Sequence, residues 1–230
     1  MISGDLRSAF GEIDIYLFDQ LLRGRFDQRR RVLDAGCGRG RNLPYLLTRG
    51  CDLFAIDDDE AAVVAVQRLV ARLAPHLPPD RVHRGRVDAL PWADASMDAV
   101  ISSAVLHFAR DADQFHAMVE EMWRVLAPGG LFFARLATSI SIEGLVHARV
   151  GRVRLPDGSD RFVVDEPTLM GITRALGGRL LDPLKTTNVQ NMRAMTTWVM
   201  EKADRCAWCE AAARRGSPHL PASSSASTDG

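Results

Sequence analysis

The chain has 230 residues, 47% hydrophobic and 25% charged, which is typical of one globular domain and excludes a disordered or fibrous protein. Its 29 basic and 29 acidic residues cancel, so we expect no extended nucleic-acid surface. No apolar run approaches the roughly 18 residues that cross a bilayer, and the start of the chain lacks the pattern of a secretory signal. Four cysteines in a chain of this size do not indicate a disulfide framework, so we expect a cytoplasmic protein.

Apolar runs of strand length alternate with amphipathic segments of helix length. Residues 1–30 are expected to form an N-terminal helix, over residues 6–22, and a linker. The expected strands then cover residues 31–35, 52–57, 81–87, 99–103 and 131–136, and the helices residues 40–49, 60–74 and 112–126. This alternation predicts a doubly wound, mostly parallel α/β sheet, whose ligands bind where the strands end.

The segment 138–165 interrupts the alternation. Residues 152–155 and 161–164 flank a Pro-Asp-Gly turn and predict a hairpin. It is a candidate lid over the ligand edge, or else a surface decoration.

The main domain is expected to close with two more strands. A helix over residues 166–176 precedes strands over residues 179–186 and 192–201, which are antiparallel if they form a hairpin. The domain therefore covers residues 31–202. Residues 203–230 have the composition of a disordered tail. That tail holds Cys206 and Cys209, a single Cys-x-x-Cys for which a zinc or redox role is disfavoured.

The sharpest motif is a glycine-rich loop, Asp34-Ala-Gly36-Cys-Gly38-Arg-Gly40-Arg41, between a strand and a helix. Glycines let a ligand lie against the backbone, and the helix start offers free N–H groups. Arg41 stands where a dinucleotide site has its third glycine, and Asp34 would repel a phosphate. An aminoacyl cofactor suits the loop better, with its carboxylate on the helix end or Arg41 and its ammonium on Asp34.

Carboxylates follow the next two strands. Asp57 lies about twenty residues past the loop, the spacing of a ribose-binding acid; Asp58 beside it is a further candidate for cofactor binding. A helix cap is the alternative for Asp57. After the third strand, Asp88 can accept a hydrogen bond from an adenine amine, and the amide of Ala89 can donate one to the ring.

These elements, with Ser103-Ala-Val-Leu-His107-Phe and Pro-Gly-Gly after them, resemble the class I S-adenosylmethionine-dependent methyltransferases. The resemblance implies a Rossmann-like sheet of seven strands whose last strand is antiparallel. It implies that Gly36 and Gly38 flank the methionine part of S-adenosylmethionine, that Asp57 holds the ribose, that Asp88 and Ala89 frame the adenine, and that Ser103 lies near the sulfonium. Within the class, the chain looks like the tellurite-resistance and thiopurine branch, which methylates small soft or anionic nucleophiles.

Methyl transfer by in-line displacement needs proximity and a dry pocket more than acid–base groups. Arg41 is the candidate that holds the cofactor carboxylate or steers an anionic acceptor, with a surface arginine as the alternative. His107 is the candidate base or donor, with a packed histidine as the alternative. Tyr16 is assigned to a packing face, with a cap over the cofactor as the alternative. Of Lys185 and Arg193 on the terminal hairpin, Lys185 is the better candidate for substrate contact, with a solvated lysine as the alternative.

The sequence therefore predicts a methyltransferase that acts on a small molecule, as a monomer or dimer, with no metal, nucleic acid or membrane partner. Two alternatives stay open. One is a non-catalytic regulatory protein that binds S-adenosylmethionine, and the other is an NAD-dependent oxidoreductase.

Overall fold

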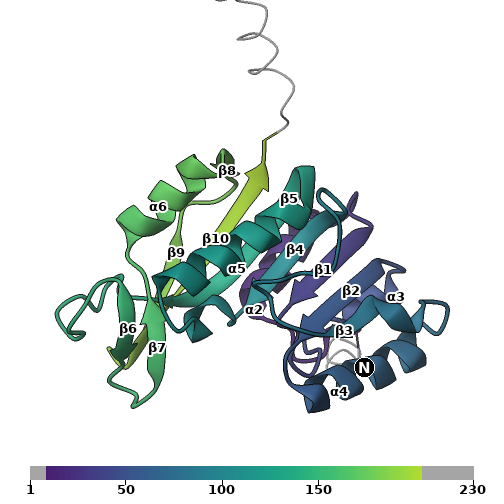
Figure 1. Ribbon diagram of the computed structural model, residues 1–230, viewed down its shortest axis with the longest axis horizontal. Helices are drawn as coiled ribbons and strands as arrows, with labels where there is room; N and C mark the ends of the chain where they lie inside the picture. Colours follow the sequence, from purple (N-terminus) through teal and green to yellow (C-terminus); the bar gives the residue numbers. More distant parts are fainter. Residues whose placement is uncertain (1–8, 204–230) are drawn as a thin grey trace, which may run out of the picture.

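The computed structural model describes residues 9–203, which fold around one mixed sheet of eight strands (Figure 1). The order is β3-β2-β1-β4-β5-β10-β8, and β9 also pairs with β10. The strands are β1 (Arg31–Ala35), β2 (Asp52–Asp57), β3 (Val82–Arg84), β4 (Met97–Ser103), β5 (Leu126–Thr138), β8 (Gly178–Leu180), β9 (Lys185–Val189) and β10 (Arg193–Lys202). The first five are parallel, and β10 is antiparallel to its neighbours. The predicted fold class is confirmed.

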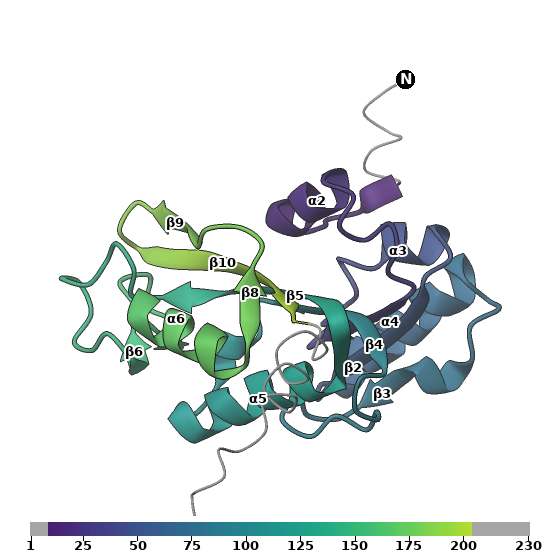
Figure 2. The same ribbon diagram turned by 90° about the horizontal axis from the view of Figure 1, so that it is seen from above.

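Helices cover both faces of this sheet (Figure 2). They are α2 (Ile15–Leu22), α3 (Pro44–Thr48), α4 (Glu60–Leu73), α5 (Ala112–Val125) and α6 (Glu166–Ala175), with short 3₁₀ turns η1 (Pro79–Arg81) and η2 (Leu106–Phe108). One apolar core lies between the sheet and α5 and α6, and the other lies beneath α2, α3 and α4. The carboxyl ends of the parallel strands therefore stay open for a site.

Two predicted elements near this edge are shorter than expected. The helix expected over residues 40–49 is a turn followed by the five residues of α3, because Gly40 has a positive φ of 80° and Pro44 sets the first helical position. The strand expected over residues 81–87 ends at Arg84. The chain from Gly85 onward is a loop that lines a pocket described below.

The N-terminal segment is not one continuous helix. The chain is helical at Ala9 and Phe10, turns at Gly11, and starts α2 after Asp14. Gly11 has a positive φ of 63°, and the Asp14 carboxylate caps α2 by accepting from the amide of Tyr16 at 2.9 Å. The expected helix over residues 6–22 is therefore confirmed for Ile15–Leu22, but it is interrupted at residues 11–14 by these two local signals.

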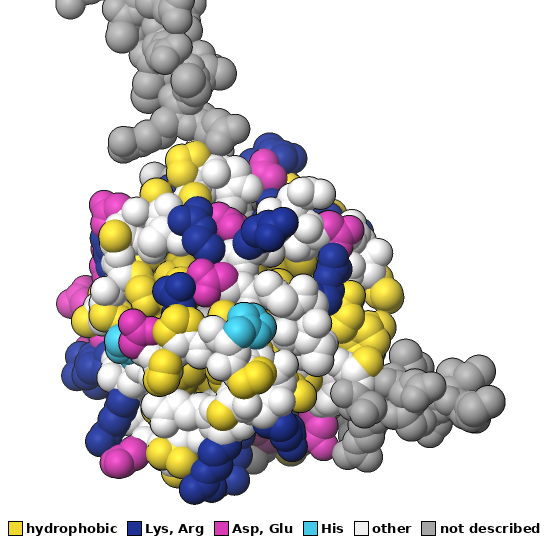
Figure 3. Space-filling model, turned by 90° about the vertical axis from the view of Figure 1, so that its right-hand side faces the viewer, with side chains coloured by type: hydrophobic (Ala, Val, Ile, Leu, Met, Phe, Trp, Pro, Cys, Tyr) yellow, Lys and Arg dark blue, Asp and Glu magenta, His cyan; other side chains and the backbone are white. Residues whose placement is uncertain are grey.

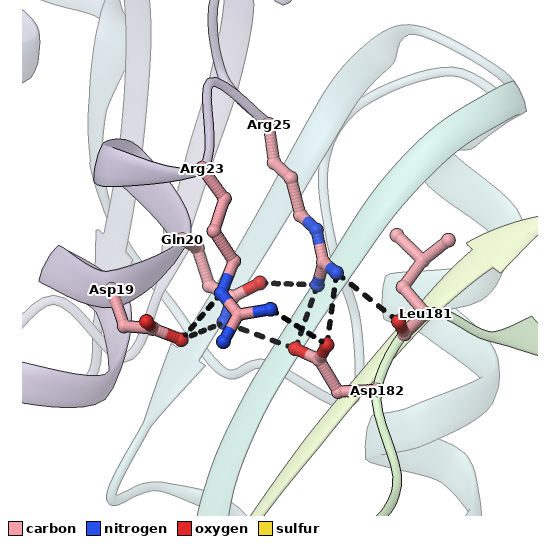
Figure 4. A network of polar contacts seen from close by, with 6 residues as sticks. All are labelled: Asp19, Gln20, Arg23, Arg25, Leu181 and Asp182. Carbon is pink, nitrogen blue, oxygen red and sulfur yellow. Dashed lines mark hydrogen bonds and ion pairs between the residues drawn. The ribbon is translucent and has the colours of Figure 1, made fainter.

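The C-terminal end of α2 and the residues after it are hydrogen-bonded to the segment between β8 and β9 (Figure 4). Arg25 donates to both oxygens of Asp182, at 2.8 and 2.9 Å, and to the carbonyl of Leu181 at 3.1 Å. Gln20 and Arg23 reach the same carboxylate. Two-pronged pairing of this kind is geometrically specific, so it fixes where α2 lies over the sheet.

The strand expected over residues 179–186 is split into β8 and β9. Between them, Asp182 pairs with Arg25, and Pro183 has no N–H to donate to a neighbouring strand. The sheet therefore has eight strands where the sequence predicts seven, because one predicted strand forms both β8 and β9. The expected antiparallel hairpin is confirmed for β9 and β10, whose turn residues Gln190 and Asn191 both have positive φ.

The hairpin within residues 138–165 is confirmed as β6 (Gly151–Arg154) and β7 (Asp160–Val163). Its inner face packs on the ends of β5 and β10 in a third apolar cluster, and Phe162 stacks on Phe115 with 5.3 Å between ring centroids. Its role as a lid stays a prediction. The predicted tail lies almost wholly outside the described residues, as do Cys206 and Cys209.

The surface beside α3 and α4 carries basic and acidic side chains interspersed, with no continuous basic stripe in this view (Figure 3). No helix within residues 9–203 has the length and apolar character of a membrane span.

Candidate functional site

The glycine loop follows β1 directly and needs its glycines for different reasons. Gly36 has a positive φ of 81°, and a Cβ there would lie 2.5 Å from Cγ2 of Val105. Gly38 also has a positive φ, of 51°, but a Cβ there would meet nothing within 4 Å. Gly36 therefore permits close packing on Val105, whereas Gly38 leaves open space above the loop.

Asp57, at the end of β2, is hydrogen-bonded to this loop. Its Oδ2 accepts from the amide of Gly38 at 2.7 Å, and its Oδ1 accepts from the amide of Asp59 at 3.0 Å. The cap of α4 is Asp59, which accepts from the amide of Ala61 at 2.9 Å. The alternative reading of Asp57 as a helix cap is therefore wrong.

A pocket of about 820 Å³ lies over these elements, a volume ordinary for a cofactor site. Seven of the predicted site residues line it: Gly36, Gly38, Arg41, Asp57, Asp58, Asp88 and Ser103. The sequence did not single out several other lining residues: Glu12, Gly85, Val105, Phe108, Gln114 and Met118. Asp34, Ala89 and His107 do not line it.

Asp34 is buried at the end of β1, and neither of its carboxylate oxygens has a hydrogen-bond partner. Burial raises the pKa of Asp34 to about 7; the charge of Arg41 opposes this shift and that of Asp57 adds to it. An unpartnered buried carboxylate is costly. A cationic or N–H-donating group bound over the glycine loop would relieve it, so the residues present fit an aminoacyl cofactor.

Asp88 is held in place by two neighbours. Arg86 donates hydrogen bonds to both carboxylate oxygens of Asp88, and Gln114 donates to Oδ2 at 3.0 Å. The hydrogen bonds from Arg86 are the main reason that the pKa of Asp88 falls to about 2. The neighbouring Ala89 is exposed, and its amide donates to the carbonyl of Arg86 at 3.2 Å. The predicted adenine contact of the Ala89 amide does not fit this geometry, because the donor is already used.

Arg41 joins the glycine loop to the end of β4. Its Nη2 donates to Oγ of Ser103 at 2.9 Å and lies 3.4 Å from Oδ2 of Asp14. Ser103 donates to the same Asp14 oxygen at 3.0 Å, and Arg135 on β5 approaches it at 3.3 Å. Arg41 is exposed, as the alternative of a surface arginine expects, but its guanidinium is held by this network.

Asp14 is the residue of this network that sequence reasoning missed. It is 4% exposed, and its amide donates to Asn42 in the loop after β1 at 3.0 Å. The cap pattern before α2 was the available signal, but a cap alone says nothing about a site on a distant strand.

His107 does not have the geometry of a general base. It is buried, and its Nδ1 accepts from the amide of Ala137 at 3.2 Å. Burial is the main cause that lowers the pKa of His107 to about 4, assisted by the charges of Arg161, Arg135 and Arg193. The neutral ring then carries its proton on Nε2 and has no free lone pair. The catalytic role predicted for His107 is not supported, and the packed histidine is what the structure contains.

Within residues 9–203, no group of three or more His, Cys, Asp or Glu side chains is arranged to hold a metal ion.

Residues 33–134 match the family model described as a methyltransferase domain. A probable S-adenosylmethionine-dependent methyltransferase of Mycolicibacterium smegmatis is 33% identical over 114 residues, which are 50% of this chain and 40% of that protein. The malonyl-[acyl-carrier protein] O-methyltransferase of Enterobacter lignolyticus is 34% identical over 119 residues, or 50% of this chain and 43% of that protein. The chain thus spans less than half the length of these two relatives.

Solved structures share the fold. The 1,6-didemethyltoxoflavin-N1-methyltransferase of Burkholderia thailandensis superposes with a TM-score of 0.65 at 21% identity, covering 87% of each chain. The [4+2]-cyclase SpnF superposes with a TM-score of 0.60 at 16% identity, covering 80% of each. At these identities the likeness concerns the fold alone.

The sheet order, the glycine loop with Asp57 and the matched domain agree on one class. Residues 33–134 are therefore similar to a methyltransferase domain, and the relatives that match this part of the chain include one described as S-adenosylmethionine-dependent.

Proposed function

We propose that this chain transfers a methyl group from S-adenosylmethionine to a small-molecule acceptor that is a soft or anionic nucleophile. The observation that carries the proposal is the pocket over the glycine loop, where the lining residue Asp57 is hydrogen-bonded to the loop. Asp34, outside the pocket lining, is buried without a partner at the end of β1, where the loop begins.

Each part of the pocket suits one part of the cofactor. Asp34, Gly36 and Gly38 take the methionine part, with Asp34 near its ammonium. Asp57 and Asp58 take the ribose, where the carboxylate oxygens of Asp57 keep lone pairs for hydroxyl groups. Asp88, oriented by Arg86 and Gln114, takes the adenine amine, with Val87 and Met118 supplying apolar pocket walls.

The cofactor supplies an activated methyl carbon: the acceptor's lone pair bonds to it while the carbon–sulfur bond breaks and its electron pair stays on sulfur. The chain's part is to position the acceptor and exclude water. Ser103, held by Arg41 and Asp14, fixes the wall of the pocket at the end of β4. His107, the expected base, is packed against β5 and does not line the pocket, which favours a nucleophile that is already an anion.

The named relatives favour a small acceptor group. One is a malonyl-[acyl-carrier protein] O-methyltransferase, and the structural neighbour from Burkholderia thailandensis is described with 1,6-didemethyltoxoflavin and S-adenosylhomocysteine bound. Assignment to the tellurite-resistance and thiopurine branch rests on the loop motif and the residues around His107 alone. The neighbour described as a cyclase is a reminder that one fold hosts several functions.

The test has two parts. Calorimetry should detect binding of S-adenosylhomocysteine, and S-adenosylmethionine should yield S-adenosylhomocysteine with at least one member of a panel of small thiols, phenols and carboxylates. Binding without turnover on the whole panel would favour the non-catalytic alternative. Binding of NADH with no response to S-adenosylhomocysteine would favour the oxidoreductase.

A further inference from the structure

The sheet face beneath α2 continues past Ser103 and carries basic side chains. Arg135 on β5 is in register with Thr197 on β10, which is in register with Lys185 on β9. Arg193 lies four residues before Thr197 on the same strand, so their side chains share a face. Arg135 and Arg193 therefore lie on one face, at the end of the sheet where the pocket opens.

Arg135 is fixed at one side of this face. Its guanidinium lies 4.9 Å from the centroid of the Tyr16 ring and 3.3 Å from Oδ2 of Asp14. Tyr16 in turn hydrogen-bonds to Thr187 on β9. The Nε of Arg135 is buried and has no hydrogen-bond partner, so this guanidinium keeps an unused donor.

Arg161 comes from the other side, on the β6–β7 hairpin. Its guanidinium lies 4.9 Å from the centroid of the Phe108 ring, and Phe108 is 57% exposed and lines the pocket. The Nη1 of Arg161 donates to the backbone carbonyl of Asp160 at 2.8 Å. Arg161 therefore lies beside the pocket-lining Phe108, and its charge, like that of Arg193, acts on the carboxylate of Asp157.

His107 lies against β5, where it accepts a hydrogen bond from the amide of Ala137, two residues after Arg135. It follows β4 directly and is bonded to the β5 backbone, and the charges of Arg161, Arg135 and Arg193 all act on its ring. The charges of three guanidinium groups from three separate elements thus act on one neutral, buried side chain.

The positive charge of this cluster is only partly compensated. Within residues 9–203, the ion pairs of the three arginines go to Asp14, which is shared with Arg41, and to Asp157, which lies 3.6 Å from Arg193. Positive charge in excess of its partners beside a pocket favours binding of an anion. Guanidinium groups match the planar geometry of carboxylates and the oxygens of phosphates.

We propose that Arg161 and Arg193, supported by Arg135, form a site for an oxyanion beside the pocket, and that the acceptor carries such a group, a carboxylate or a phosphate. The identification of the bound molecule as the methyl acceptor rests on the proposed function. The existence of the oxyanion site does not depend on it.

The site can be tested by binding, with the full chain and no acceptor in hand. Benzoate and phenyl phosphate serve as oxyanion probes and benzamide as the neutral match, each measured by ligand-observed NMR with and without S-adenosylhomocysteine. We expect at least one of the two oxyanions to bind about tenfold more tightly than benzamide. Tighter binding of benzoate would indicate a carboxylate site, and tighter binding of phenyl phosphate a phosphate site.

Substitutions locate the site. Arg161→Gln and Arg193→Gln should each weaken the preferred oxyanion by about fivefold, while Arg161→Lys keeps most of the preference. The matched control is Arg154→Gln, an exposed arginine of the same hairpin that pairs with Asp160, which should leave all affinities unchanged. Equal affinity for benzamide and both oxyanions, or equal effects of Arg161→Gln and Arg154→Gln, would overturn the site. If the wild-type chain does not bind S-adenosylhomocysteine, the proposed function is overturned instead.

Discussion

The amide of Gly38 donates to Oδ2 of Asp57 at 2.7 Å, which ties the loop after β1 to the end of β2. The two strands are adjacent and parallel, and the amides of Gly36 and Cys37 also donate to the carbonyl of Ile56 in β2, at 2.9 and 3.0 Å. Together these hydrogen bonds fix the loop over the strand edge. The ribose and methionine ends of the proposed cofactor site are therefore parts of one rigid unit.

The two glycines of this unit should respond differently to alanine. Gly36→Ala adds a Cβ 2.5 Å from Val105 at a positive φ, so we expect destabilisation by about 3 kcal/mol, seen in urea unfolding. Gly38→Ala meets nothing within 4 Å and should cost only about 1 kcal/mol. It should nevertheless weaken S-adenosylhomocysteine binding, because the new methyl group occupies space above the loop. Unchanged binding by Gly38→Ala would argue that the ligand does not lie there.

Asp34 should link cofactor binding to pH. Burial raises its pKa from 3.8 to about 7, so between these values the folded chain holds a proton that the unfolded chain has lost. The free energy of unfolding should therefore fall as pH rises through this window and level off above it. A ligand ammonium requires the ionised form, so S-adenosylhomocysteine should bind about tenfold more weakly one unit below this pKa than at high pH.

Calorimetry in buffers of different ionisation enthalpy should show that a proton is released on binding below pH 7. Asp34→Asn is the control, since it should bind weakly with no pH dependence in this range. A wild-type affinity independent of pH from 5 to 8 would contradict the role of Asp34.

Arg41→Ala should lower turnover or acceptor affinity by at least about tenfold, because Ser103 and Asp14 lose the guanidinium that holds them. The measurement is steady-state kinetics with an acceptor found in the panel. The matched control is Arg39→Ala, which lines the pocket next to Arg41 without joining this network. Wild-type kinetics in Arg41→Ala would remove Arg41 from the site.

Asp14→Ala should destabilise the fold by about 3 kcal/mol, since it removes the cap of α2 and leaves Arg41 and Arg135 without their shared carboxylate. Asp59→Ala removes only the cap of α4 and should cost about 1 kcal/mol. Equal losses in thermal or urea unfolding would show that the buried network adds nothing to the cap.

The sequence predicted the parts of the site that are local. The glycine loop and the carboxylate that follows β2 lie within about twenty residues of each other, and the parallel sheet brings consecutive strand ends together. The periodic helices α4 and α5 were predicted for the same reason, since a buried stripe and an N-terminal cap are both short-range signals.

The remaining site residues depend on tertiary contacts that no local pattern reveals. Asp14 meets Ser103 and Arg135 from 89 and 121 residues away. His107 follows β4, as predicted, but it is buried and accepts a hydrogen bond from the β5 backbone, so it is a packed side chain and not a base. The amide of Ala89 donates a hydrogen bond to the carbonyl of Arg86 within its own turn. The residue types alone do not predict that bond.

The most direct test is a crystal structure of the chain with S-adenosylhomocysteine. The account predicts that the ribose hydroxyls hydrogen-bond to Asp57, that the ammonium lies toward Asp34 and that the sulfur faces the wall at Ser103. A ligand bound elsewhere, or a sugar with no contact to Asp57, would contradict it.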